Sequence, residues 1–348
     1  MASTRLPALM LCFVLGGAAC GEAHAPVDAR PDPLDAGPTI DDAGAPPRLD
    51  AAVIMDASMP LDGGPPEADA GPSTPDEVER TFRVMHWNIA GGKENDCATG
   101  GITRAVRRFV RERDIDFVGL NEVCPAQYAA IRDALRAQWG LDPDARFAAF
   151  VGDETGRVVG NAIYARLPIT GVTRHAVGED RYGIRNLLCA RVATLPHLRF
   201  CSTHLTPGDT AAARQLGRVM DRVEGWWADR RDTVILSGDL NLQADHPALD
   251  AVYASAVDTR NNRNNRGRYR EVDDDDPAHC RGFGERTLPG TRGGPCREGG
   301  KIDFIFVRQN RIVSGNYDGD TLNIPADCTG VCSDHRPVIG RVRLRIQR

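Results

Sequence analysis

Two short polar segments, each at the end of an apolar run, contain the residue types that metal-assisted hydrolysis uses. In the first, a Val-Ile-Leu-Ser-Gly run leads to Asp239 and Asn241, and in the second Asp334 stands beside His335. A strand that stops at a glycine and then presents a carboxylate and an amide offers oxygen ligands at the edge of a sheet. A carboxylate beside an imidazole adds a hard-metal ligand and a group that transfers protons. The two segments together predict hydrolysis of a phosphate ester.

Further polar residues end other apolar runs, namely Asn88, Glu122, His204 and Asp303. Most of them have an ordinary explanation when taken alone, since asparagine favours turns and a buried histidine is usually hydrogen bonded. Asp303 is harder to explain in this way, because it interrupts an apolar strand, where a carboxylate is costly unless it is paired. The joint pattern therefore indicates one site assembled from several strand ends.

Apolar periodicity predicts the elements that would position these residues. Spacings of three and four predict helices, and alternation or short apolar runs predict strands. The predicted helices are 102–110, 125–139 and 211–227, and the predicted strands are 82–89, 116–123, 161–165, 171–177, 187–192, 198–203, 234–237, 302–307 and 338–346. Consecutive strand pairs mixed with helices favour an α/β sandwich over a doubly wound sheet. Residues 258–300 fit no periodic element and predict a long loop.

The first 20 residues are typical of a secretory signal, with Arg5, an apolar core and then small residues before Cys20. This end resembles a bacterial lipobox, although Gly17 stands where an aliphatic residue is usual. We therefore expect an exported lipoprotein of the outer membrane or cell surface, anchored through Cys20. The alternative is ordinary cleavage nearby and a secreted protein.

Residues 21–79 are an acidic linker of low complexity, rich in Ala, Asp, Pro and Gly. Fourteen acidic residues stand against Arg30 and Arg48, and few aromatic residues are present, so no packed core is expected. The whole chain carries −5, so without this linker and Arg5 the predicted catalytic domain, 80–348, carries about +6. A basic domain favours an anionic substrate.

Eight cysteines lie in the predicted domain, and an even number in an exported chain predicts disulfides. Order and spacing favour the pairs 97–124, 189–201, 280–296 and 328–332. A zinc site that starts from Cys328, Cys332 and His335 is the alternative. An oxidising compartment and the lack of an evident fourth ligand argue against that site.

Seven short segments contain the polar residues at the ends of the apolar runs: MHWNI at 85–89, VGLNEV at 118–123, GNAI at 160–163, STHL at 202–205, SGDLN at 237–241, KIDFI at 301–305 and SDHRPV at 333–338. In sequence and in order, they resemble segments of the endonuclease/exonuclease/phosphatase superfamily, which has the DNase I-like fold. One departure is Asn121, where the family more often has glutamine. The resemblance implies a four-layer α/β/β/α sandwich with the site at one rim of the sheets.

The resemblance also implies a metal site. Glu122 would be the main ligand of a divalent cation, helped by Asn88 and Asp334. The cation would be Mg²⁺, with Mn²⁺ or Ca²⁺ as alternatives, since hard cations take oxygen ligands.

The catalytic set that the resemblance implies comprises His204, Asp239, Asn241, Asp303 and His335. Asp303 would orient His335, which would activate water or bind the phosphate. His204 would protonate or stabilise the leaving oxygen, while Asp239 and Asn241 would orient water and phosphate. Which histidine acts as the base is left open.

The residues around these motifs argue for some classes of substrate and against others. Leu-Gln follows Asn241 where inositol polyphosphate 5-phosphatases have Tyr-Arg, and no hairpin rich in exposed aromatic residues favours a sphingomyelinase. Five arginines and Tyr269 in 260–270 suit a phosphate backbone, or else form a solvated loop balanced by the acids at 273–276. Arg185 and Asn186 are further candidates for phosphate contact.

We therefore expect a monomeric, exported, metal-dependent phosphodiesterase, and specifically a nuclease acting on DNA. A sphingomyelinase-like or other phospholipid or inositol phosphate hydrolase is the alternative. A surface binding protein without catalytic activity is the alternative from another class.

Overall fold

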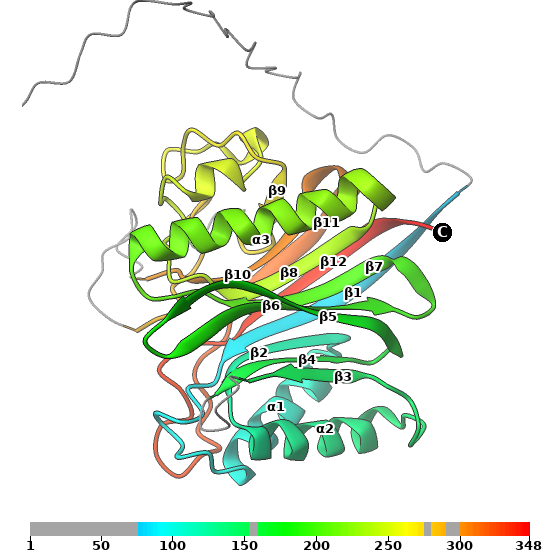
Figure 1. Cartoon of the computed structure of the whole chain (residues 1–348), viewed down its shortest axis with the longest axis vertical. Coiled ribbons are helices and arrows are strands. Elements are labelled where there is room, and N and C mark those ends of the chain that lie inside the picture. The colour runs from blue at the N-terminus through cyan, green and yellow to red at the C-terminus, as the bar shows by residue number, and fades with distance from the viewer. Residues whose placement is uncertain (1–75, 153–158, 275–279, 290–299) are drawn as a thin grey trace, which may run out of the picture. The chain divides into compact units, whose positions relative to one another are not determined.

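The computed structural model describes residues 76–152, 159–274, 280–289 and 300–348 (Figure 1). The predicted signal sequence, the lipobox and nearly all of the predicted linker lie outside the described residues. The first strand begins at Glu77, inside the range expected for the linker. Within the described ranges, no helix has the length and apolar character that crossing a membrane requires.

Two six-stranded sheets make up the framework. The first has the order β11-β12-β1-β2-β4-β3 and consists of β1 (Glu77–Asn88), β2 (Phe117–Val123), β3 (Ala148–Val151), β4 (Gly160–Ala165), β11 (Ile312–Thr321) and β12 (Val338–Gln347). The second has the order β5-β6-β7-β8-β10-β9 and consists of β5 (Ile169–Asp180), β6 (Gly183–Val192), β7 (Leu195–His204), β8 (Thr233–Asp239), β9 (Tyr269–Glu271) and β10 (Asp303–Arg308).

The helices α1 (Gly100–Glu112), α2 (Pro125–Trp139) and α3 (Asp209–Arg230) follow from local sequence. α1 buries the apolar stripe that its spacing predicts, from Ile102 to Val110. α2 begins at a proline, which suits the first helical turn, and ends where Gly140 takes a left-handed conformation with φ of 62°. Short 3₁₀ turns lie at Leu249–Ala251, Ser255–Val257 and Gln309–Arg311.

Three apolar cores separate four layers. α1 and α2 cover the outer face of the first sheet and α3 covers the second, while the inner faces of the two sheets pack against each other (Figure 1). Between the sheets, the rings of Phe117 and Phe200 lie 5.1 Å apart, centroid to centroid. The predicted four-layer α/β/β/α sandwich is confirmed.

Strand register brings the predicted site residues to one edge. β1 and β2 are parallel, with Asn88 opposite Asn121, and β7 and β8 are parallel, with His204 opposite Asp239. β10 runs antiparallel to β8, so that its first residue, Asp303, also lies opposite Asp239. The carboxyl ends of four strands and the start of a fifth therefore meet at the same rim.

The three predicted helices and nine predicted strands are confirmed, with ends that differ by a few residues. Three further strands, β3, β9 and β11, were not predicted. β3 and β9 are short, and β9 lies inside the predicted loop 258–300. β11 is an edge strand with several polar residues and a break in its register between Ile312 and Tyr317, so it lacks regular apolar alternation.

The cysteine predictions are largely confirmed, since three of the expected disulfides are present: Cys97–Cys124, Cys189–Cys201 and Cys328–Cys332. Cys280 is disulfide-bonded, whereas its expected partner at position 296 lies outside the described residues. The alternative zinc site is wrong, because the disulfide leaves Cys328 and Cys332 without the thiolates that would bind zinc.

Candidate active site

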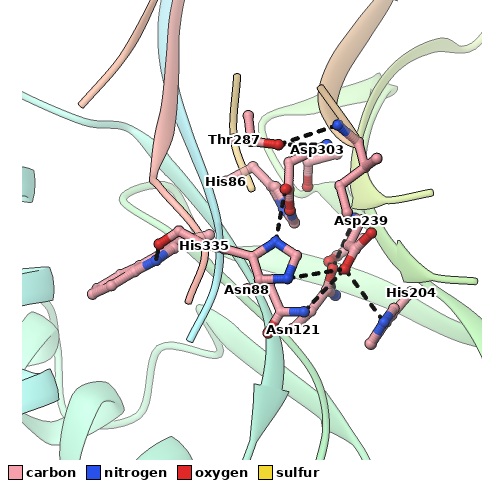
Figure 2. A network of polar contacts seen from close by, with 12 residues as sticks. His86, Asn88, Asn121, His204, Asp239, Thr287, Asp303 and His335 are labelled. Carbon is pink, nitrogen blue, oxygen red and sulfur yellow. Dashed lines mark hydrogen bonds and ion pairs between the residues drawn. The ribbon is translucent and has the colours of Figure 1, made fainter. Parts of the chain in front are cut away.

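Asp303 lies fully buried between two histidines (Figure 2). Its Oδ2 is 2.8 Å from Nδ1 of His335, its Oδ1 is 3.1 Å from Nε2 of His86, and its backbone N–H donates to Oγ1 of Thr287 at 3.2 Å. Burial alone would raise the pKa of Asp303, but the two histidines outweigh it and hold that pKa well below its usual range. Both carboxylate oxygens are engaged, so Asp303 orients the imidazole of His335.

A second set of hydrogen bonds fixes the loop of His335 to the end of β1. The hydroxyl of Ser333 donates to the carbonyl of Asn88 at 2.6 Å and accepts from the backbone N–H of His335 at 2.9 Å. The indole N–H of Trp87 donates to the carbonyl of His335 at 3.0 Å. The loop is thus held from two directions, and the Nε2 atom of His335 faces Asp239, 3.8 Å from its Oδ2.

Asp239 is the point at which the predicted residues converge (Figure 2). Its Oδ2 lies 3.4 Å from Nε2 of His204 and accepts a hydrogen bond from Nδ2 of Asn88 at 3.0 Å. Its Oδ1 accepts from the backbone N–H of Asn241 at 2.9 Å. The side chain of Asn241 in turn lies 3.2 Å from Nε2 of His204. One carboxylate therefore stands between two imidazoles, those of His204 and His335.

Asn121 connects the two sheets behind this carboxylate. Its Oδ1 accepts from the backbone N–H of Asp239 at 3.0 Å, and its Nδ2 donates to Oδ1 of Asn161 at 2.8 Å and to Oγ of Ser202 at 3.2 Å. Asn121 is fully buried, and it positions the end of β8. The available signal for this role was the position of Asn121 directly before Glu122, where the family more often has glutamine.

Glu122 adopts a backbone conformation that is unusual for its residue type. Its φ is 54°, and the pairing of β2 with β4 is irregular between Leu120 and Val123. Such backbone strain concentrates at functional sites. Oε1 of Glu122 accepts from Nδ2 of Asn88 at 3.0 Å. Gly91 packs so closely here that a Cβ would lie 2.5 Å from the carbonyl oxygen of Glu122.

A cavity of about 570 Å³ opens in front of these groups. Asn88 and Asp303 are fully buried and do not line the cavity, but they hold the side chains that do. Arg185 and Asn186, expected near phosphate, line the cavity, and Arg185 is paired with Asp180 at 2.8 Å. The remaining residues of the predicted set all line the cavity: Glu122, His204, Asp239, Asn241, Asp334 and His335.

The two histidines that face Asp239 differ in charge. Burial lowers the pKa of His204 to about 4, with Arg185 and His335 adding to the effect and Asp239 opposing it. Burial also acts to lower the pKa of His335, but Asp303 and Asp239 outweigh it and raise this pKa to about 10. At neutral pH, His204 is therefore neutral and His335 carries a positive charge.

The carboxylates of Glu122 and Asp334 both line the cavity and offer hard oxygen ligands that could hold a cation. Asn88 donates to both Glu122 and Asp239, and thereby orients these carboxylates. In the described part of the chain, one group of three potential ligands lies within 4.8 Å, formed by Asp239, Asp303 and His335. Because both oxygens of Asp303 already bind histidines, this group suits proton transfer and orientation better than metal binding.

Several residues of the site were not predicted. His86 lies in the MHWNI segment but was not given a role. A buried histidine in an apolar strand needs a polar partner, and Asp303 is that partner. Lys93 pairs with Asp334 at 2.5 Å and lines the cavity. Ser333 lies in the SDHRPV segment but was given no role, and Thr287 lies in the predicted loop 258–300; both act through hydrogen bonds between their hydroxyl groups and the backbone.

The arginine-rich stretch 260–270 does not line the cavity. Tyr269 is buried, and its hydroxyl donates to Glu224 at 2.5 Å, so its predicted contact with nucleic acid is wrong. Arg270 binds Gln309 at 2.8 Å, and Arg266 pairs with Asp250 at 3.2 Å. Four of its five arginines, at 260, 263, 266 and 268, are exposed outside the cavity, so their contact with a phosphate backbone stays a prediction.

The chain matches the Endonuclease/Exonuclease/phosphatase family over residues 85–335. It belongs to that family. The matched range contains all the predicted site residues, and members of the family are divalent-metal-dependent hydrolases of phosphoric esters, of the phosphodiesterase or nuclease type. This member is therefore a metal-dependent hydrolase of phosphoric esters. The comparison with curated proteins finds no match.

Solved structures share the fold at low sequence identity. Truncated TDP2 of Caenorhabditis elegans is 16% identical, with a TM-score of 0.54, over 75% of this chain and 97% of that one. A family protein of Bacteroides thetaiotaomicron is 16% identical, with a TM-score of 0.53, over 77% and 99% of the two chains. D. rerio TDP2, complexed with a single-strand DNA product, is 18% identical, with a TM-score of 0.53, over 75% and 98%.

Proposed function

We propose that this family member is an exported, Mg²⁺-dependent nuclease that hydrolyses DNA. The observation that carries the proposal is the convergence of His204 and His335 on Asp239, in a cavity that Glu122 and Asp334 also line. Arg185 and Lys93 add positive groups to the same cavity, which suits a phosphate backbone. The single-strand DNA product in the D. rerio TDP2 structure further supports a nucleic acid substrate.

Glu122 would be the main ligand of the cation, with Asp334 and Asn88 assisting. When bound, the cation would neutralise charge on the phosphate as the pentavalent transition state forms. Asp303 holds Nδ1 of His335, so that Nε2 faces the cavity, where it can bind the phosphate or exchange a proton with water. Asp239 would orient the attacking water.

His204 and Asn241 would act on the leaving oxygen. The amide of Asn241 is anchored by a hydrogen bond to the carbonyl of Leu205 at 2.9 Å, and it lies beside Nε2 of His204. A fixed hydrogen-bonding group at a position where charge develops is an efficient form of catalysis.

Cleavage of DNA by the purified protein tests the proposal. We expect plasmid and oligonucleotide cleavage with Mg²⁺ or Mn²⁺, no cleavage with EDTA, and a loss of about 10²- to 10⁴-fold in rate for His335→Ala. His246→Ala, at a histidine that does not line the cavity, should retain activity. Plasmid that stays intact while the same protein hydrolyses sphingomyelin would contradict the nuclease assignment.

Export and lipid anchoring form a separate part of the proposal, supported by the N-terminal sequence and by the disulfides of the domain. We expect the full-length chain in the membrane fraction, with a diacylglyceryl group on Cys20 detectable by mass spectrometry. Cys20→Ala should move the protein to the soluble or cytoplasmic fraction. Equal membrane recovery of both proteins would contradict the anchor.

A further inference from the structure

Two apolar side chains are exposed beside the cavity. Tyr182 is 52% exposed and Ile184 is 40% exposed, and both line the cavity at the turn between β5 and β6. They are two of the three large apolar residues that are exposed in the described part of the chain. Apolar surface at the mouth of a catalytic cavity marks a place where a ligand makes contact.

The turn holds Tyr182 in a fixed position. Oδ1 of Asp180 accepts from the backbone N–H of Tyr182 at 2.7 Å, and its Oδ2 accepts from Nε of Arg185 at 2.9 Å. Arg181 donates to the hydroxyl of Tyr182 at 2.6 Å, and its guanidinium carbon lies 4.7 Å from the ring centroid. A ring that is ordered before binding loses little entropy when a ligand packs on it.

The charges around Tyr182 identify the class of ligand. Arg181 and Arg185 flank the ring, and Arg185 also lines the cavity that contains the catalytic groups. An aromatic face beside arginines is the combination with which proteins bind single-stranded nucleic acid, the ring stacking on a base and the guanidinium contacting the backbone.

We propose that Tyr182 and Ile184 form an apolar ledge that stacks one unpaired base beside the scissile phosphate. The inference rests on the proposed nuclease function and adds a substrate class to it. In a duplex each base is already stacked and paired, so a base can reach the ledge only after it has been freed, at a cost in free energy. The enzyme therefore prefers single-stranded DNA, or a single-stranded end, over duplex DNA.

A steady-state comparison of two substrates tests the ledge. A labelled oligonucleotide is supplied to the full chain either alone or annealed to its complement, with Mg²⁺. We expect a higher kcat/KM on the single strand, and a loss of about 10- to 100-fold on that substrate for Tyr182→Ala, the range that replacement of a stacking aromatic gives. Duplex cleavage should change by less than about threefold.

Matched variants separate stacking from other effects. Tyr182→Phe keeps the ring and should retain the preference for single strands, whereas Ile184→Ala should lose part of it. In the His335→Ala background, which slows turnover, an oligonucleotide carrying 2-aminopurine should show quenched fluorescence on binding. Adding Tyr182→Ala to that background should remove the quenching.

Three outcomes would overturn the ledge. If the wild type cleaves DNA but Tyr182→Ala changes single-strand and duplex rates equally or not at all, the ledge is wrong and the nuclease function stands. If Tyr182→Ala abolishes binding to phosphatidylcholine–phosphatidylglycerol vesicles and spares single-strand cleavage, the two residues contact a membrane. If the wild type cleaves no DNA of either form, the proposed function fails together with the ledge.

Discussion

The two ends of one short segment, Lys301 and Asp303, each belong to a cluster of buried charged residues, and only one of the two clusters reaches the cavity. Asp303 binds two histidines, of which His335 lines the cavity. Lys301 binds Oε1 of Glu271 at 3.3 Å and Oδ2 of Asp273 at 3.0 Å, and none of these three residues lines it. The Asp303 cluster therefore presents Nε2 of His335 to the cavity, whereas the Lys301 cluster is enclosed by protein.

The comparison teaches that burial of charge alone does not identify a catalytic group. Lys301, Glu271 and Asp303 are all fully buried, and all are paired. Burial would lower the pKa of Lys301, but Glu271 and Asp273 outweigh it and raise this pKa, so the ammonium stays charged. Only the histidine cluster presents an atom to the cavity, so we assign chemistry to that cluster and stability to the other.

The largest expected effect is on activity, from Asp303→Asn. The amide keeps the shape of the side chain but removes the charge that orients His335, so we expect kcat on a DNA oligonucleotide to fall about 10²- to 10⁴-fold. Circular dichroism should show a folded protein, and the pH–rate profile should shift, since the pKa of His335 depends on this charge. A rate within threefold of the wild type would show that the cluster is only structural.

Lys301→Met should have the opposite signature. At about pH 9, above the pKa of about 8 of Glu271, it leaves two buried carboxylates without their cation, so we expect the free energy of unfolding in urea to fall by about 3–5 kcal/mol. The rate per folded molecule should change by less than about threefold. Adding Glu271→Gln should recover part of the stability, and a large loss of kcat without a loss of stability would reverse the assignment of roles.

A pH titration of stability sharpens the comparison. Burial raises the pKa of Glu271 to about 8, although Lys301 opposes the shift. Because the folded state binds this proton more tightly than the unfolded chain, the stabilisation is complete below about pH 4.5 and is lost as the pH rises through about 8. Urea denaturation at pH 5 to 8 should show a steeper loss for the wild type than for Glu271→Gln. Parallel curves would contradict this.

The smallest change in the free energy of unfolding is expected where an ion pair is exposed to solvent. Asp114 lies 2.8 Å from Arg83 and 2.7 Å from Arg166, and 58% of its side chain is exposed. Water and salt screen such pairs, so Asp114→Asn should change the free energy of unfolding by less than about 1 kcal/mol. A larger change in the same urea assay would mean that exposure is a poor guide to ion-pair strength in this protein.

Much of the framework could be predicted because it depends on local pattern. The helix 125–139 was predicted to the residue, since a proline starts it and a glycine ends it. The site residues were predicted from strand ends, and parallel register brings them together. The burial of individual side chains could not be predicted, because it depends on how the two sheets stack. Sequence therefore did not show that Asn88 supports the cavity from behind, or that Tyr269 is buried.

Specificity was the least predictable part. The arginine-rich stretch is conspicuous in the sequence but does not line the cavity, while Tyr182 is unremarkable in the sequence and lines it. Which side chains reach the substrate depends on the relative placement of loops, which carries no periodic signal.

Two of the disulfides lie directly beside the proposed metal ligands. Cys124 follows Glu122 by two positions, and Cys332 precedes Asp334 by two. We expect a thiol reductant to lower the rate more than it lowers the melting temperature, because both ligand loops would loosen; an unchanged rate would contradict this. Under the nuclease activity and export proposed above, a freshly made chain in a reducing cytoplasm would then cut DNA poorly, and the chromosome of the producing cell would be spared until export.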